Sequence, residues 1–291
     1  MAPPEFIPFG GDEVAPFDPE SAEIVVLPIP YERDASYGTG SQDGPFHMLQ
    51  ASVQLERIDE ETFTAWGDLK IRTDFPLMPT GTPESAMIEI QSAASRLLSE
   101  GRRVLCLGGD HSISIGPILA AAKAVPELGL LWIDAHLDLR DTWNGSRYNH
   151  ACVMRRVIEE SGIPVIPVGT RSVAPEELAA AEHHRIQPVY AHAIDPLDSS
   201  WIRRVVDALP EHVYLSIDLD GLDPSVVPGT GTPEPGGLSY RQVVSLIAAV
   251  GQHRTVIAAD LTELAKIPGS QVSEYTAARL AAKIFVHCFT P

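Results

Sequence analysis

The chain has 291 residues, of which 44% are hydrophobic and 21% charged, and its formal net charge is −18 at pH 7. This acidic balance argues against a nucleic-acid partner, because phosphate binding needs clustered Lys and Arg; it is compatible with a cationic substrate or with adaptation to a salty cytoplasm. The sequence contains no run of about 18 apolar residues that could span a membrane.

The first residues and the cysteines indicate where the protein works. Residues 1–8 have neither the basic region nor the apolar region of a secretory signal, which argues against export. The three cysteines, Cys106, Cys152 and Cys288, are an odd number in apolar settings, so we expect free thiols in a reducing compartment. Together these features predict a cytoplasmic protein.

Apolar runs typical of buried strands alternate with segments of helical periodicity along the chain. An irregular, proline-rich segment over residues 1–22 is followed by a first strand at 24–30 and by a loop of turn-forming residues at 37–45. The remaining strands are expected at 104–107, 129–134, 163–168, 213–218 and 255–261. The helices are expected at 84–99, 115–124, 151–160, 174–183, 200–209, 240–250 and 274–285.

This alternation predicts an α/β fold. Near-continuous apolar strands joined through helices are typical of a mostly parallel sheet with helices on both faces, which makes three layers. No linker, repeat or low-complexity tract interrupts the pattern, so residues 1–291 are expected to form a single domain. Ser239 and Gln242 have the spacing of a capping box, which marks the start of the helix at 240. In such sheets, ligands bind beyond the carboxyl ends of the strands.

Asp and His residues follow three of the expected strands at close spacing. The three groups are Asp110 and His111, then Asp134, His136 and Asp138, and then Asp218 and Asp220. Alternate residues of a strand point to one face, so the acids and histidines of the second and third groups should converge at their strand ends. Carboxylates gathered so closely are disfavoured unless a cation offsets their repulsion and desolvation. The number of acids and histidines suits two divalent ions.

The ligand types favour manganese. Carboxylates with some imidazole suit Mn²⁺, with Mg²⁺, Co²⁺, Ni²⁺ or Zn²⁺ as substitutes, and the absence of thiolates from the groups weighs against a structural zinc site. Two such ions roughly 3.5–4 Å apart would lower the pKa of a shared water enough to supply hydroxide near neutral pH. The motifs therefore predict metal-assisted hydrolysis. Asp110 is expected to support its loop rather than to bind a metal.

These motifs, in this order, resemble those of the ureohydrolase family, which contains the arginases and agmatinases, and most closely those of the agmatinase branch. The most specific segment runs from Ser216 to Leu238. Further matching segments are 108–112, 134–138, 150–156 and 260–264, and the similarity extends over residues 25–285. The resemblance implies an arginase-like fold and a homotrimer or homohexamer.

The resemblance also implies a role for each site residue. One Mn²⁺ would be held by His111, Asp134, Asp138 and Asp218, and the other by Asp134, His136, Asp218 and Asp220, with Asp134 and Asp218 bridging the pair. His150 matches a pocket histidine that moves protons, and Glu263 matches a carboxylate that holds the substrate guanidinium. His150, or Asp138 through the bridging water, could then protonate the departing amine.

The expected reaction releases urea from a small cationic guanidino compound, and agmatine, which would give putrescine, is the favoured substrate. Guanidinobutyrate, guanidine, guanidinopropionate and arginine are alternatives of the same class. A hydrolase for the acidic formimidoyl-glutamate is a further alternative, because its substrate would need the basic residues Arg140, Arg147 and Arg171. A metal-binding pseudoenzyme is the alternative from another class. Asp141, in the loop 140–149, would suit the distal ammonium of agmatine or be a solvated loop residue.

Overall fold

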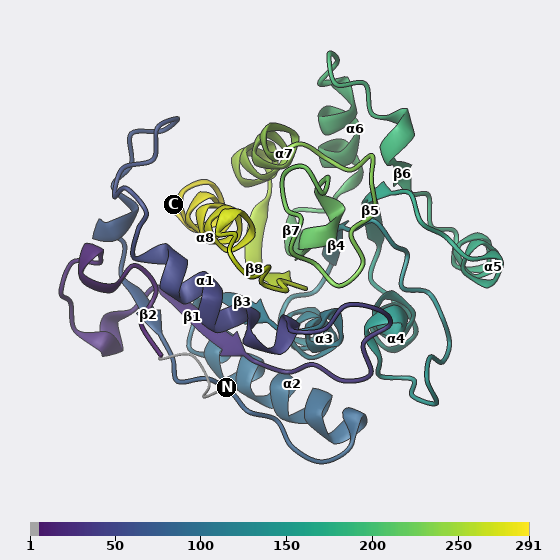
Figure 1. Cartoon of the computed structure of the whole chain (residues 1–291), viewed down its shortest axis with the longest axis horizontal. Helices are drawn as coiled ribbons and strands as arrows, with labels where there is room; N and C mark the ends of the chain where they lie inside the picture. The colour runs from purple at the N-terminus through teal and green to yellow at the C-terminus, as the bar shows by residue number, and fades with distance from the viewer. Residues whose placement is uncertain (1–5, 291) are drawn as a thin grey trace.

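A sheet of eight parallel strands forms the centre of the molecule in the computed structural model, which describes residues 6–290. In chain order the strands are β1 (Ile24–Ile29), β2 (Ile71–Thr73), β3 (Arg103–Gly108), β4 (Leu128–Ile133), β5 (Val165–Thr170), β6 (Val189–Tyr190), β7 (His212–Asp218) and β8 (Thr255–Thr262). They lie in the order β2-β1-β3-β8-β7-β4-β5-β6, and every pairing between them is parallel (Figure 1). The predicted α/β architecture with a parallel sheet is therefore confirmed.

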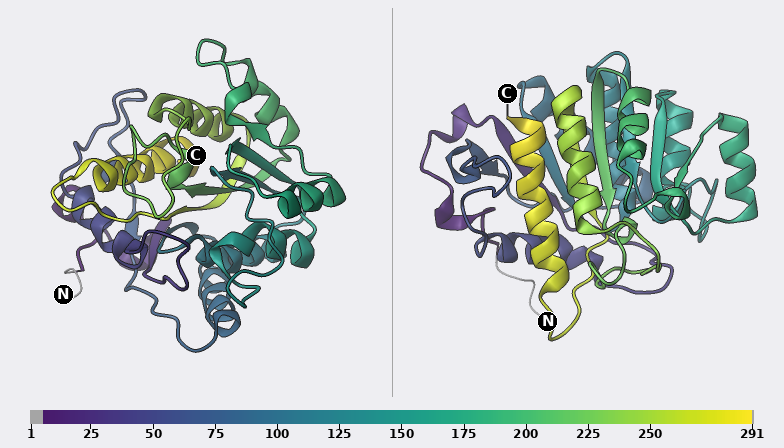
Figure 2. Two further views of the ribbon diagram at one scale, coloured as in Figure 1. Left: turned by 45° about the vertical axis from the view of Figure 1, so that its right-hand side comes forward. Right: turned by 90° about the horizontal axis from the view of Figure 1, so that it is seen from above.

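Helices cover both faces of this sheet. They are α1 (Gly44–Ser52), α2 (Pro83–Ser99), α3 (Ile115–Ala124), α4 (Val153–Ser161), α5 (Pro175–His184), α6 (Ser200–Ala208), α7 (Tyr240–His253) and α8 (Val272–Ile284). Helices α2 to α5 pack on one face, and α1, α6, α7 and α8 pack on the other (Figure 2). Alternate strand residues supply the two cores, since Val104 and Cys106 of β3 face the first layer while Leu105 and Leu107 face the second.

The expected elements are present with shifts of at most three residues at their ends, but three further elements carry no clear sequence pattern. Strands β2 and β6 have three and two residues, which is too short to show a period, and they form the two edges of the sheet. The prediction of a loop over residues 37–45 is wrong at its C-terminal end, because Gly44 and Pro45 begin α1. Proline suits the first turn of a helix, where its missing N–H would have no partner.

Local features at the ends of the chain and of α7 also bear on the predictions. Residues 6–22 hold only two short 3-10 turns, and residues 1–5 of the expected irregular segment lie outside the described part. The capping box is confirmed, since Gln242 N donates to Ser239 Oγ at 3.2 Å and Ser239 N donates to Gln242 Oε1 at 2.9 Å. All three cysteines are free and buried, as expected.

Between residues 6 and 290, no helix combines the length and the apolar character that crossing a bilayer requires.

Strands β3, β8, β7 and β4 are neighbours in the middle of the sheet, and their carboxyl ends lie along one edge. The loops after β1 and β7 meet over this edge, where Gly38 N donates a hydrogen bond to Gly231 O at 3.0 Å. Both loops, purple and green, lie at the lower edge of the right-hand view in Figure 2. The sheet thus exposes the ends of its central strands to one loop-covered hollow.

Candidate metal centre

Four neighbouring strands deliver acidic and imidazole side chains to this hollow. His111 follows β3, Asp134 follows β4, Asp218 ends β7 and Glu263 follows β8. Together with residues of the surrounding loops, they border a cavity of about 280 Å³. The sequence groups that were expected at strand ends therefore lie at one place, although more than 100 residues separate His111 from Asp218.

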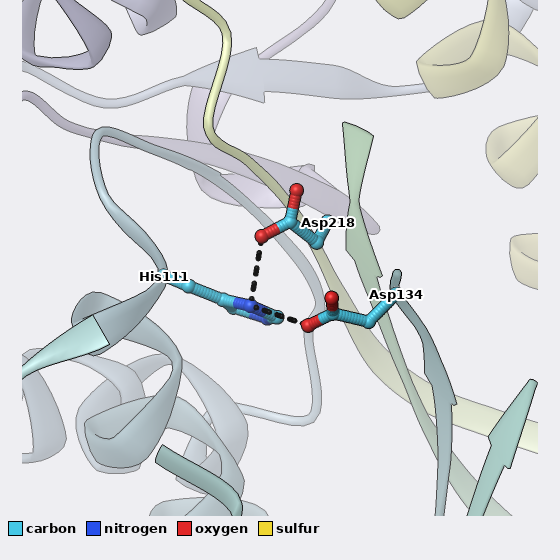
Figure 3. A group of neighbouring side chains, drawn as sticks. All are labelled: His111, Asp134 and Asp218. Carbon is cyan, nitrogen blue, oxygen red and sulfur yellow. Dashed lines mark ion pairs between the residues drawn. The ribbon is translucent and has the colours of Figure 1, made fainter. Parts of the chain in front are cut away.

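Three carboxylates surround one ring nitrogen of the buried His111. Its Nδ1 atom lies 3.2 Å from Asp134 Oδ2, 3.3 Å from Asp138 Oδ2 and 3.1 Å from Asp218 Oδ2. Figure 3 shows the imidazole with Asp134 and Asp218 on two sides of this nitrogen. The ligand atoms of His111, Asp134 and Asp218 are close enough to one another to hold a single metal ion.

A second group shares Asp134 with the first. His136 Nδ1 lies 3.4 Å from Asp134 Oδ1 and 3.1 Å from Asp220 Oδ2, and these three residues could also hold one ion. Asp220 is held in place by hydrogen bonds from Ala135 N at 3.2 Å and from Thr232 Oγ1 at 3.1 Å. Asp134 thus faces both groups, one oxygen toward each. A bridging role for Asp218 stays a prediction.

The atoms of the two groups are arranged for a cation rather than for hydrogen bonds with one another. His111 Nδ1 and Asp134 Oδ2 are buried and have no hydrogen-bond partner among residues 6–290. Burial and then the charge of Asp134 raise the pKa of Asp138 to about 7, and burial with the charges of Asp220 and Asp134 raises the pKa of Asp218 well above its usual range. A divalent cation would relieve this repulsion and use the unpartnered atoms. The ligand atoms of the two groups fit two cation positions that share Asp134.

A buried polar chain supports the far side of His111. Its Nε2 atom lies 3.1 Å from Ser216 Oγ, which donates to Asp260 Oδ1 at 2.7 Å. Tyr214 donates to the other oxygen of Asp260 at 2.8 Å, and the imidazole stacks on Trp132 with a centroid distance of 4.2 Å. These contacts hold the ring with Nδ1 toward the carboxylates and leave Nε2 facing a hydroxyl, the arrangement that a metal-binding histidine needs.

Two predicted site residues have left-handed backbones, which is rare outside glycine. Asp138 has a φ of +49° and Glu263 has a φ of +66°. Glu263 is further fixed by two hydrogen bonds, since His111 N donates to its Oε1 at 2.7 Å and its own N donates to Gly109 O at 2.8 Å. The loop after β3 and the residue after β8 therefore hold each other beside the cavity.

The pocket histidine expected from the sequence, His150, borders the same cavity. It begins a 3-10 turn that Asn149 caps by accepting a hydrogen bond from Ala151 N at 3.0 Å. Burial, and then the positive charges of His111 and His136, lower the pKa of His150 to about 4. The imidazole is therefore neutral at pH 7 in this arrangement.

The walls of the cavity include residues that the sequence did not single out. Glu177, in the first turn of α5, is 5% exposed and borders the cavity, while its carboxylate accepts hydrogen bonds from Leu139 N at 3.2 Å and Ala174 N at 3.0 Å. Trp143 borders the mouth, and Arg140 stacks over its ring at 4.4 Å. A proline followed by acids in a first helical turn was the available signal for Glu177, but that pattern is common at ordinary helix starts.

The charged residues of the 140–149 loop all take part in ion pairs, and of these residues only Arg140 borders the cavity. Asp141 pairs through Oδ1 with Arg156 at 2.7 Å and with Arg147 at 3.3 Å, and it is not among the residues that border the cavity. Arg140 is paired with Glu176, and Arg147 also pairs with Glu159.

Arg171 donates to several backbone carbonyls, including that of Asp220 at 2.6 Å. Each of the three arginines that could have bound an acidic substrate therefore has a partner among residues 6–290.

Comparisons with known proteins agree with this geometry. The chain is 38% identical over 271 residues to the N(1)-aminopropylagmatine ureohydrolase of Synechocystis sp., a match that covers 90% of this chain and 88% of that protein. It is 33% identical to the agmatinase of Pyrococcus horikoshii, over 92% of this chain and 93% of that protein.

Among solved structures, the agmatine ureohydrolase of Thermoplasma volcanium superposes with a TM-score of 0.88 at 27% identity, covering 97% of this chain and 94% of that one. The sequence model of the Arginase family matches residues 22–290. The chain therefore belongs to the Arginase family, which confirms the resemblance drawn from its motifs.

Proposed function

We propose that this chain hydrolyses a small guanidino amine to urea and an amine, with two divalent cations bound at the carboxyl edge of the sheet. The observation that carries the proposal is the sharing of Asp134 by two groups of carboxylate and imidazole ligands in one cavity. The names of the relatives, ureohydrolase and agmatinase, support a hydrolase acting on the carbon–nitrogen bond of a guanidino group. An enzyme of this class is also consistent with the acidic cavity, since a guanidinium arrives charged.

Six side chains would hold the two ions, and Mn²⁺ is the metal that their oxygen-rich mixture favours. They are His111, Asp134, His136, Asp138, Asp218 and Asp220. When bound there, the cations supply Lewis-acid chemistry and activate water as a nucleophile near neutral pH. The protein side chains then have to orient the guanidinium and handle its protons.

Glu263 and His150 are suited to those two tasks. The carboxylate of Glu263 borders the cavity and still has an oxygen that accepts no hydrogen bond from the backbone, so it can pair with the N–H groups of a planar guanidinium. His150, neutral at pH 7, can take up a proton and give it to the departing amine. Asp138, which also borders the cavity, is the other group that could carry a proton.

Glu177 is our choice for the group that receives the ammonium end of the substrate. It is a buried acid on the cavity wall, and it retains lone pairs beyond the two that its backbone partners use. Glu177 is the better placed carboxylate of the two, because it borders the cavity and Asp141 does not. The engaged state of Arg140, Arg147 and Arg171 disfavours formimidoyl-glutamate, because an acidic substrate would need a free cation.

Agmatine is the substrate we favour, and N1-aminopropylagmatine is the second candidate. The relatives with 38% identity carry the second name, against 33% for the agmatinase of Pyrococcus horikoshii. The mouth of the cavity is bordered by Tyr37, which is 85% exposed, so a longer amine chain could leave the cavity there. Both compounds are guanidino amines and share the binding features proposed above.

The test is urea release by the Mn²⁺-loaded protein at mildly alkaline pH. The panel contains agmatine, N1-aminopropylagmatine, arginine, guanidinobutyrate, guanidinopropionate and guanidine, with formimidoyl-glutamate followed by formamide release. Preference for either amine supports the proposal, and preference for arginine or an acid overturns the role of Glu177. No turnover with two metal ions bound would favour the pseudoenzyme. We also propose that residues 1–291 form one domain within a homotrimer or homohexamer, and light scattering tests the number of subunits.

A further inference from the structure

A serine on the loop after β1 contacts the pocket histidine. Ser36 Oγ lies 2.8 Å from His150 Nε2, although 114 positions separate the two residues in the chain. The indole of Trp143 donates to the same serine oxygen at 3.1 Å. Because an indole N–H can only donate, Ser36 accepts that hydrogen bond and keeps its own proton for another partner.

The serine is the one side-chain partner that fixes the imidazole within residues 6–290. His150 Nδ1 is buried and has no hydrogen-bond partner there, so Nε2 alone is tied. The neighbouring backbone adds a second link between the loops, because Asn144 Nδ2 donates to Asp34 O at 3.4 Å. The loop after β1 and the loop after β4 are thus joined across the mouth of the cavity through Ser36.

We propose that Ser36 is a positioning residue for His150, and that its hydroxyl, held by Trp143, fixes the orientation of the imidazole from which His150 transfers protons. This inference rests on the proposed function, in which His150 moves a proton. Without the hydroxyl, the ring would keep its place in the turn but lose the contact that sets its direction. Misalignment of a proton-transferring group lowers kcat more than it weakens substrate binding, because the contact matters most in the transition state.

Three variants test this role. Ser36→Ala removes the hydroxyl, Ser36→Thr retains it, and Thr39→Ala is the matched control on the same exposed loop. Ser36 is exposed, so each variant should fold, and thermal unfolding checks that it does. For Ser36→Ala we expect kcat to fall about tenfold with KM changed less than threefold, which is a part of the 10²–10⁴-fold that acid–base catalysis contributes in all. Ser36→Thr should recover most of the loss.

The direct readout is ¹⁵N nuclear magnetic resonance of the His150 ring together with the indole N–H signal of Trp143. Ser36→Ala should shift both signals and move the limb of the kcat–pH profile that reports His150, whereas Thr39→Ala should change neither. Unchanged ring signals and an unchanged kcat in Ser36→Ala would overturn the inference, as would equal losses in Ser36→Ala and Ser36→Thr. If the wild-type protein releases no urea, the proposed function fails while the ring signals still decide whether Ser36 orients His150.

Discussion

Replacing Asp134 by Asn should affect both proposed cation positions, while replacing Asp220 by Asn should affect one. Asp134 faces His111 through Oδ2 and His136 through Oδ1, whereas Asp220 contacts only the second histidine. At a free metal concentration of 100 times Kd, each independent site adds about 2.7 kcal/mol to the free energy of unfolding, so the wild type should gain about 5 kcal/mol. The pattern of contacts therefore predicts that metal raises the free energy of unfolding by a different amount in the wild type and in each of the two variants.

With one site intact and the other weakened about 100-fold, Asp220→Asn should gain about 3 kcal/mol from the same metal concentration. Loss of a shared ligand should weaken each site in Asp134→Asn by at least the roughly 100-fold that altering a supporting contact can cause. The gain should then fall below about 1 kcal/mol for the two sites together, because each contributes only RT ln 2. Bound metal should follow the same order, with two ions in the wild type, one in Asp220→Asn and fewer in Asp134→Asn.

The measurement is thermal unfolding by calorimetry with and without Mn²⁺, combined with metal analysis of the gel-filtered protein. Guanidinium chloride and urea are avoided as denaturants because they resemble the proposed substrate and its product. Asp141→Asn is the control, since Asp141 pairs with arginines outside the metal centre and should keep the full gain. Equal gains in Asp134→Asn and Asp220→Asn would refute the sharing of Asp134, and a wild-type gain in Asp134→Asn would refute its role as a ligand.

Two further predictions concern substrate binding and the response to acid. Glu177→Gln should raise KM for agmatine at least tenfold, because a charge-assisted hydrogen bond contributes about 1.5–3 kcal/mol, and it should leave KM for guanidine unchanged. Glu182→Gln, which changes an exposed residue of the same helix, is the control. Equal effects of Glu177→Gln on both substrates would exclude the ammonium contact. Burial alone would raise the pKa of Asp59, but hydrogen bonds from buried Lys283 and from the backbone lower it to about 2. The pKa of Asp59 is lower in the folded state than in the unfolded state, so this group adds about 2 kcal/mol to the free energy of unfolding above pH 4, and that contribution should disappear toward pH 2. Asp59→Asn should abolish this part of the dependence of stability on acid.

The gathering of acids and histidines at the strand ends could be predicted from the sequence because their spacing reflects strand geometry. Asp134, His136 and Asp138 directly follow an apolar run, and the carboxyl ends of parallel strands form a single edge. The same periodicity located all the long strands and seven helices. It could not locate β2 and β6, since two or three residues carry no period and their pairing depends on neighbours far along the chain.

Residues of the cavity walls lacked such a signal. Ser36 is one polar residue in a loop of polar residues, and its contact with His150 depends on how two loops pack. Asp141 was the acid nearest the motifs, yet tertiary packing pairs it with Arg156. Glu177 reaches the cavity from a helix start about 40 residues further on. Proximity in sequence is thus a poor guide to which charge faces a substrate.

Backbone conformation at the site shows why local preferences fail there. Turn chemistry alone would place glycine at a φ of +49° or +66°, yet these positions hold Asp138 and Glu263. A left-handed non-glycine residue costs on the order of 1–3 kcal/mol, and such residues persist where the surroundings hold them. Here the hydrogen bonds between Glu263 and the loop after β3, together with the approach of Asp138 to His111, provide that support. Glycine at either position would relax the backbone and remove a carboxylate from the cavity, and five other residues outside glycine, among them Phe63 and Arg185, have the same left-handed backbone.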